Sequence, residues 1–103
     1  MEVNEATFES EVIESCVPVL VDFYGVWCPP CRQIAPLVDK LAKEHEGKLK
    51  VAKVNVDENS TLSAKYQVSA IPALLFFKNG IVVDQYLGVQ KEAVLQEAIE
   101  RLS

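Results

Sequence analysis

The sequence predicts an α/β fold in which one mixed β-sheet is flanked by helices on both faces. Two observations predict this class: apolar runs typical of buried strands alternate with helical periodicity, and a hairpin signal precedes the last helix. Alternating strands and helices imply parallel pairing, whereas a hairpin requires antiparallel strands. At 103 residues, the chain is expected to form a single domain over residues 1–103.

The first half of the chain carries the clearest strand and helix signals. A weak strand around Val3 and a helix over residues 7–14 open it. Residues 18–24 form a nearly continuous apolar run, as expected of a strand buried on both faces. Over residues 34–42, apolar side chains recur at i, i+3, i+4, i+7 and i+8, which predicts an amphipathic helix.

The second half is organised around a hairpin. Asn79-Gly80 separates two apolar runs and is a strong signal for a two-residue turn. The elements predicted here are a buried strand over residues 49–56, a short helix over residues 59–66, hairpin strands over residues 73–78 and 81–86, and an amphipathic helix over residues 91–102.

Composition and charge exclude several functional classes. Half of the residues are apolar, enough for a core without disulfide scaffolding. The net charge of −5 and the lack of a basic stripe argue against nucleic acid or an anionic membrane as a partner. No apolar run approaches the ~18 residues of a membrane span. The N-terminal residues lack the basic and apolar regions of a signal peptide, so we expect a cytoplasmic protein. We also expect a monomer.

The segment Trp27-Cys28-Pro29-Pro30-Cys31 carries the strongest functional signal. Two cysteines at this spacing close into a small disulfide ring or open to two thiols, one of them acidic, as in proteins that exchange electrons with other disulfides. The position between a predicted strand and a helix favours redox chemistry over metal binding. Cys28 falls near the helix N-terminus, where unpaired N–H groups and the helix dipole favour a thiolate. We expect Cys28 to attack substrate and Cys31, which should be less exposed, to resolve the mixed disulfide.

Two charged residues interrupt the apolar strands. Asp22 lies six residues before Cys28, and loss of hydration should raise its pKa into the range that suits proton transfer near neutral pH. From there it could reach the back of the dithiol, nearest Cys31. Lys53 lies in the other buried strand and suggests a partly buried pair with Asp22. The pattern is equally compatible with two edge residues that point to water.

Two further segments leave alternatives open. Ile71-Pro72 precedes an apolar strand, and the cis form accounts for only about 5–6% of X–Pro bonds, so the sequence alone favours trans. Trp27, beside Val26 and Pro30, would make an apolar lip for docking polypeptide if it were exposed. Burial in the core is the commoner position of a lone tryptophan.

The remaining thiol and the histidine have modest expected roles. Cys16 is expected to be a small, semi-buried residue, with a regulatory thiol as the alternative. His45 is expected to be a solvated helix cap. One CxxC pair with Cys16 and His45 does not supply four well-spaced ligands, so no metal site is expected in one chain, although a dimer sharing two CxxC pairs would supply them.

An ordered set of segments gives the chain a specific resemblance. The set comprises residues 19–24, Trp27-Cys28-x-Pro30-Cys31, Ala35-Pro36, residues 51–57, Ile71-Pro72, and residues 77–80 with Gly88 beyond. On these segments the chain resembles the thioredoxin family over essentially its full length. The resemblance implies a thioredoxin fold and a protein dithiol–disulfide oxidoreductase that reduces disulfides in other proteins.

The same resemblance implies site roles position by position. Cys28 would be the nucleophile and Cys31 the resolving thiol, with Asp22 assisting deprotonation of Cys31 and Lys53 tuning Asp22. Pro72 matches the family's cis-proline, which reverses the preference for trans. The substrate-docking rim would consist of Trp27, Ala70, Ile71, Pro72, Gly88 and Val89. No bound cofactor is implied beyond the redox-active Cys28–Cys31 disulfide, and the usual electron donor is a flavoprotein reductase that draws on NADPH.

The dipeptide between the cysteines departs from the family pattern. Pro29-Pro30 stands where the family usually has Gly-Pro. Pro29 fixes φ and removes a backbone donor near the thiolate, so the pair is expected to tune the redox potential, in a direction that the sequence leaves open. The departure also raises alternatives: a specialised or atypical relative serving one dedicated partner, or a non-catalytic binding module with the same fold.

Overall fold

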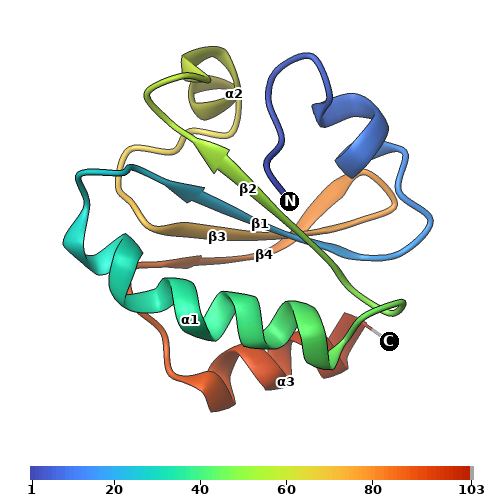
Figure 1. The fold of residues 1–103 in the computed structure, drawn as a ribbon. Coiled ribbons are helices and arrows are strands. Elements are labelled where there is room, and N and C mark those ends of the chain that lie inside the picture. The colour runs from blue at the N-terminus through green and yellow to red at the C-terminus, as the bar shows by residue number, and fades with distance from the viewer. Residues whose placement is uncertain (103) are drawn as a thin grey trace.

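The structure is a computed structural model that describes residues 1–102, and it contains a four-stranded sheet between two layers of helices (Figure 1). In chain order the elements are the short π-helical segment η1 (Glu9–Ile13), β1 (Val19–Tyr24), α1 (Pro29–Glu44), β2 (Lys50–Asn55), α2 (Ser60–Lys65), β3 (Ala73–Lys78), β4 (Ile81–Leu87) and α3 (Glu92–Leu102).

The sheet is mixed, as the sequence predicts. Its strand order is β2-β1-β3-β4, with β1 and β2 parallel and the other two pairs antiparallel. The register places Asp22 of β1 opposite Lys53 on one side and Leu74 on the other. Asp22 therefore lies on an inner strand, with a backbone neighbour on each side.

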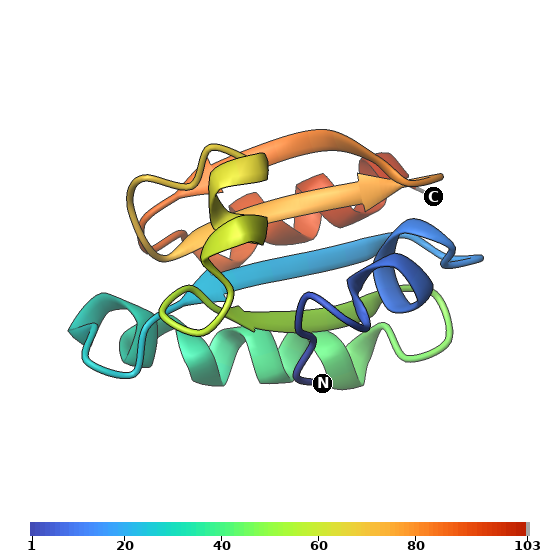
Figure 2. The same cartoon turned by 90° about the horizontal axis from the view of Figure 1, so that it is seen from above.

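Alternation along β1 divides the core into two layers. Val19, Val21 and Phe23 belong to the buried cluster that η1 and α2 cover, whereas Leu20 belongs to the cluster under α1 and α3. Figures 1 and 2 show the two long helices on one face of the sheet and the short helices on the other. Because side chains in a strand alternate between faces, Asp22 points to the α1 face with Leu20.

The N-terminal segment pairs with the outer edge of β2. Glu2 forms an isolated parallel bridge with Lys53, less than the strand expected around Val3. Lys53 N–H donates to the Met1 carbonyl at 2.8 Å, and Val3 N–H donates to the Lys53 carbonyl at 2.9 Å. These bonds hold residues 1–3 against the sheet on the side where Glu2 can reach the end of β1.

Helix α1 begins at Pro29, five residues before residue 34, where the apolar periodicity that predicted the helix starts. Pro29 and Pro30 occupy the first two helical positions, where the missing N–H groups would have no intrahelical acceptor. The helix consequently begins directly at the CxxC motif. Buried residues Cys31, Ile34, Val38 and Leu41 then continue one face of the helix against the sheet.

The hairpin turn has the expected two-residue geometry. Asn79 and Gly80 have φ of 55° and 79°, which matches the two positive values of a type I′ turn. A register shift follows Phe76, so β4 carries a bulge. The turn and the bulge together set which side chains of β4 face the sheet core.

We predict that Gly80→Ala destabilises the fold more than Gly47→Ala. Both glycines have positive φ, 79° and 85°, where an alanine costs about 1–2 kcal/mol. A Cβ on Gly80 would lie 3.1 Å from both Cγ2 and the carbonyl oxygen of Ile13, whereas nothing lies within 4 Å of a Cβ on Gly47. Urea unfolding of the two variants measures the difference. Equal losses of unfolding free energy would show that Ile13 moves away from the new Cβ at no energetic cost.

Candidate active site

Cys28 is the N-cap of α1. Its backbone is extended, with φ −95° and ψ 108°, and its Sγ accepts a hydrogen bond from the Cys31 N–H at 3.3 Å. Because Pro29 and Pro30 carry no N–H, Cys31 provides the first backbone donor of the helix. This geometry places the Cys28 sulfur at the positive end of the helix, where a thiolate is stabilised.

Cys28 and Cys31 are joined as a disulfide, and their Cα atoms are 5.3 Å apart. Cys28 is 3% exposed and Cys31 5%, so the expectation that Cys31 is the less exposed of the two is wrong for this oxidised state. The physical reason lies in their neighbours: Cys28 Sγ lies 4.0 Å from the Ile71 carbonyl oxygen, while Cys31 borders a cavity behind the motif.

The Ile71-Pro72 peptide bond is cis. The preference for trans drawn from frequency alone is therefore wrong, and the expectation carried by the resemblance is confirmed. Gly88 N–H donates to the Pro72 carbonyl at 2.8 Å, which ties the end of β4 to this loop. The loop places Ile71 directly beside Cys28.

Apolar residues surround the dithiol at the surface. Trp27 is 61% exposed and Val26 64%, so the alternative of a core tryptophan is wrong. The Trp27 Nε1–H donates to Asp57 Oδ2 at 2.7 Å, which orients the indole without burying it. Ile71 and Trp27 both lie 3.0 Å from where a Cβ on Gly25 would be, so the absence of a side chain there lets them approach each other.

The other predicted rim residues complete this surface. Ala70 and Val89 are exposed, Ile71 and Gly88 are half-buried, and Pro72 is buried. Because Ile71 lies against Cys28 and Gly88 is bonded to Pro72, the loops that carry these residues lie together beside the motif.

Asp22 is buried next to the dithiol. It is 3% exposed, and its Oδ1 has no hydrogen-bond partner among the described residues. Burial raises the pKa of Asp22 to about 6, Lys53 opposes this rise, and the carboxylates of Glu2 and Asp39 add to it. The pKa of Asp22 is thus raised by burial, which is the direction that the sequence predicts.

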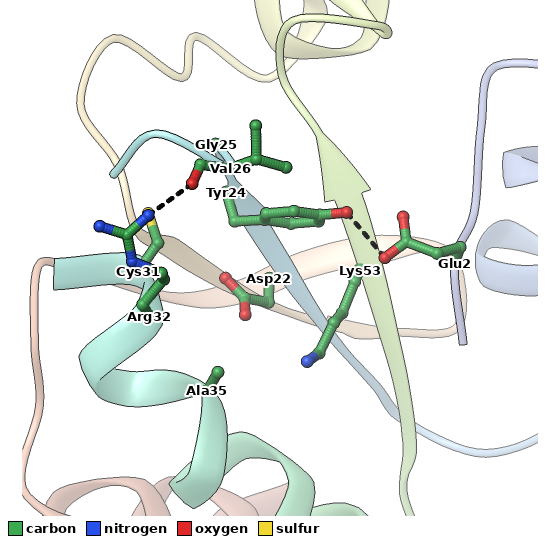
Figure 3. Close-up of a pocket in the computed structure, with 9 residues that line it drawn as sticks. All are labelled: Glu2, Asp22, Tyr24, Gly25, Val26, Cys31, Arg32, Ala35 and Lys53. Atoms are coloured by element: carbon green, nitrogen blue, oxygen red, sulfur yellow. Dashed lines mark hydrogen bonds between the residues drawn. The ribbon is translucent and has the colours of Figure 1, made fainter. Parts of the chain in front are cut away.

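A cavity of about 340 Å³ connects Asp22 with Cys31. Figure 3 shows Asp22 between Cys31 and Lys53, with the Tyr24 ring along the same wall. The residues that line it are Glu2, Asp22, Tyr24, Gly25, Val26, Cys31, Arg32, Ala35 and Lys53. The carboxyl group of Asp22 and the buried Cys31 therefore border the same cavity.

Lys53 is not paired with Asp22 in the way the strand pattern suggested. Its ammonium forms an ion pair with Asp39 Oδ1 at 3.1 Å, and the two side chains are 23% and 65% exposed. Asp39 lies on α1 and remains hydrated, so it holds the lysine without the desolvation that a pair with buried Asp22 would require. Lys53 acts on Asp22 through space, as one of several nearby charges.

Sequence reasoning missed two residues that line this cavity, Glu2 and Arg32, and it also missed Asp39, which forms an ion pair with the cavity-lining Lys53. Arg32 Nη1 donates to the Val26 carbonyl at 2.8 Å and so closes the cavity beside the motif. Asp39 follows Ala35 by one helical turn, and this i, i+4 spacing from a cavity-lining residue is a signal that could have found it. No local pattern points to Glu2, since only the pairing of residues 1–3 with β2 brings it there.

Cys16 and His45 lie outside the CxxC motif, and the structure shows their exposure and contacts. Cys16 is a free, exposed thiol, so the expected semi-buried position is wrong. His45 is the C-cap of α1, as expected, but it is half-buried and its Nε2 lies 2.9 Å from Gln96 Oε1, so the expectation that it is solvated is wrong. Over residues 1–102, no group of three or more His, Cys, Asp or Glu side chains is arranged to hold a metal ion. The helices of the same stretch are all too short or too polar to span a membrane.

The chain is similar to known proteins over nearly its whole length, including the residues of the site. A sequence model of the family described as Thioredoxin matches residues 1–101. Thioredoxin 1 of Nostoc sp. is 46% identical over 100 residues, which cover 97% of this chain and 94% of that protein. Thioredoxin of Rickettsia felis is 41% identical over 99 residues, covering 96% and 94%. The chloroplastic M-type thioredoxin of Pisum sativum is 48% identical over 99 residues, covering 96% of this chain and 58% of that longer protein.

We predict that Asp22→Asn stabilises the fold at pH 7.5 but not at pH 4. Folding raises the pKa of Asp22 from 3.8 to about 6, so the native state holds a proton that the unfolded chain releases in this window. Native stability therefore falls as pH rises through it, and removal of the ionisable group should recover up to about 3 kcal/mol above it.

Urea unfolding at the two pH values tests this expectation. Glu46→Gln, which removes an exposed carboxylate far from the cavity, is the control for a general change of charge. An equal effect of Asp22→Asn at both pH values would show that Asp22 ionises normally in the folded protein.

Proposed function

Because the chain belongs to the thioredoxin family and is a protein disulfide oxidoreductase, we propose that Cys28, Cys31 and Asp22 divide the steps of the reaction among them. The observation that carries this assignment is the position of Cys28 as N-cap of α1, with its Sγ accepting the Cys31 N–H. A sulfur in this position is the better anion of the pair and hence the better nucleophile and leaving group.

In the first step the Cys28 thiolate attacks one sulfur of a substrate disulfide. A Cys28–substrate bond forms, the substrate S–S bond breaks, and the other substrate sulfur leaves as a thiolate that takes up a proton. In the second step Cys31 gives its proton to the Asp22 carboxylate and attacks Cys28 Sγ. The Cys28–Cys31 disulfide forms, the mixed disulfide breaks, and the second substrate sulfur leaves as a thiolate that takes up a proton. Two electrons have then passed from the dithiol to the substrate.

Asp22 is suited to the second step by its surroundings. It lines a cavity together with Cys31, whereas Cys28 is not among the residues that line this cavity. A pKa of about 6 leaves it mostly ionised at neutral pH and still able to hold a proton briefly. Lys53 supports the ionised form of Asp22 through its charge while it is held by Asp39.

The rim residues Trp27, Ala70, Ile71, Pro72, Gly88 and Val89 would hold the substrate polypeptide. The exposed indole of Trp27 and the exposed side chain of Val89 offer apolar contact to such a polypeptide. An extended segment of an unfolded or flexible protein presents backbone groups and apolar side chains to such a surface.

We further propose a flavoprotein reductase that draws on NADPH as the electron donor, a monomeric state and a cytoplasmic location. The family usually receives its electrons from such a reductase. A monomer leaves the rim free for both reductase and substrate. The exposed free thiol of Cys16 is suited to a reducing compartment.

Replacement of single cysteines should separate the two steps. Cys28→Ser is expected to abolish reduction of insulin disulfides in the presence of NADPH and a thioredoxin reductase, because the attacking sulfur is lost. Cys31→Ser should form a covalent mixed disulfide with substrate that persists, since the resolving thiol is absent. Mass spectrometry detects the adduct, and Cys16→Ser is the matched control. Turnover by Cys28→Ser contradicts the assignment, and so does a mixed disulfide that accumulates on Cys31 of Cys28→Ser while none forms on Cys28 of Cys31→Ser.

The Pro29-Pro30 dipeptide between the two cysteines should set the redox potential of the Cys28–Cys31 couple. Pro29→Gly restores an N–H at the first turn of α1 and loosens the reduced loop, and both effects favour the dithiol. One hydrogen bond contributes about 0.5–1.5 kcal/mol. We therefore expect the potential to rise by about 10–30 mV, measured by equilibration against glutathione. Gln33→Ala, an exposed change in the same helix, is the control. No shift beyond that control would mean that Pro29 does not tune the couple.

A further inference from the structure

Glu2 is held at the wall of the Asp22 cavity although it lies far from the redox motif in sequence. It is one of the nine residues that line the cavity. Backbone hydrogen bonds on both sides of it, from Lys53 N–H to Met1 and from Val3 N–H to Lys53, fix its position against β2. The side chain is thus presented to the cavity by paired backbone and not by a free terminus.

Tyr24 holds the carboxylate of Glu2. Its hydroxyl donates to Glu2 Oε2 at 2.8 Å, and Figure 3 shows the ring extending along the cavity wall toward Glu2. Burial and this hydrogen bond raise the pKa of Tyr24 to about 12, so the phenol stays protonated and remains a donor at neutral pH. A neutral donor orients the carboxylate and leaves its negative charge intact.

The charges around Asp22 come from three elements besides its own strand. Lys53 faces it from β2, Asp39 from α1 and Glu2 from the N-terminal segment. The ammonium of Lys53 is in contact with Asp39, which offsets the charge of that acid. Arg32 of α1 and Tyr24 of β1 complete the ionisable lining of the cavity in the oxidised protein, and Cys31 joins them when the disulfide is reduced. Glu2 is therefore the carboxylate of this set whose hydrogen-bond partner is uncharged.

We propose that Glu2 is a positioning residue of the redox reaction, which acts through its charge on the proton that Asp22 exchanges with Cys31. A negative charge fixed at the cavity wall opposes ionisation of the buried carboxyl group, so Asp22 keeps its proton to a higher pH. The N-terminal segment then belongs to the proton-transfer apparatus. The kinetic part of this inference rests on the proposed role of Asp22, whereas the electrostatic part does not.

Glu2→Gln separates the electrostatic role from a purely structural one. The amide oxygen of glutamine still accepts the Tyr24 hydrogen bond, so the N-terminal segment stays anchored while the charge is lost. The titration of the Asp22 carboxyl carbon is followed by ¹³C NMR in the oxidised protein. The midpoint should move to lower pH in Glu2→Gln, and not in the control Glu46→Gln.

Salt provides a second readout. Glu2 is exposed, so its effect on Asp22 should be screened as ionic strength rises from 0.01 M toward 1 M, where the Debye length falls from about 30 to about 3 Å. The midpoints of the wild type and Glu2→Gln should therefore converge at high salt. An unchanged midpoint in Glu2→Gln at low salt overturns the proposal, whatever the activity of the variant.

Tyr24→Phe tests whether the hydrogen bond is needed. Without the hydroxyl, the Glu2 side chain is released to solvent and its charge is better screened, so the Asp22 midpoint should again fall. In the double variant, Glu2→Gln should then add little to Tyr24→Phe. Fully additive shifts would overturn the claim that Tyr24 acts by holding Glu2.

The pH dependence of substrate reduction connects the inference to the reaction. With Asp22 as the base for Cys31, the acid limb of the rate profile should move to lower pH in Glu2→Gln, and turnover at pH 5.5 should exceed that of the wild type. A shifted Asp22 titration with an unshifted rate profile supports the coupling between Glu2 and Asp22. That same result counts against the proposed role of Asp22, so the two failures are distinguishable.

Discussion

The hydrogen bond from the Cys31 N–H to Cys28 Sγ is the interaction on which the site depends. It exists because β1 ends four residues before Cys28 and α1 begins directly after it, so the chain turns from strand to helix at the reactive sulfur. Pro29 and Pro30 contribute by having no N–H groups, which leaves Cys31 as the first backbone donor. The rest of the fold holds this turn against the Ile71-Pro72 loop.

Burial of the Asp22 carboxyl group lowers the stability of the fold at neutral pH. An inner strand would ordinarily carry an apolar residue at this position, as Leu20 does two residues earlier on the same face. The carboxyl group instead lies under α1 with one oxygen unpartnered and an elevated pKa. Perturbed pKa values of this kind cluster at functional sites, and a raised carboxyl pKa next to a reactive thiol fits that pattern.

Local patterns predicted most of the fold, and contacts between distant segments account for what they missed. The buried run over residues 18–24 and the turn at Asn79-Gly80 depend on neighbouring residues, and both appear as expected. The partner of Lys53 could not be predicted, because helix α1 and not the strands brings Asp39 to it. The same holds for Glu2, which meets Tyr24 across 22 residues of sequence. The exposure of Trp27 and the cis bond before Pro72 likewise depend on how loops meet at the end of the sheet.

The pairing of residues 1–3 with β2 has a consequence for self-association. An open sheet edge is a template onto which other chains can add as further strands, and aggregation often starts there. Here the N-terminal segment covers the β2 edge, and the bulge after Phe76 distorts the β4 edge, so neither side offers a long, straight strand. Both edges are therefore poorer templates for another chain than an uncovered, straight strand would be.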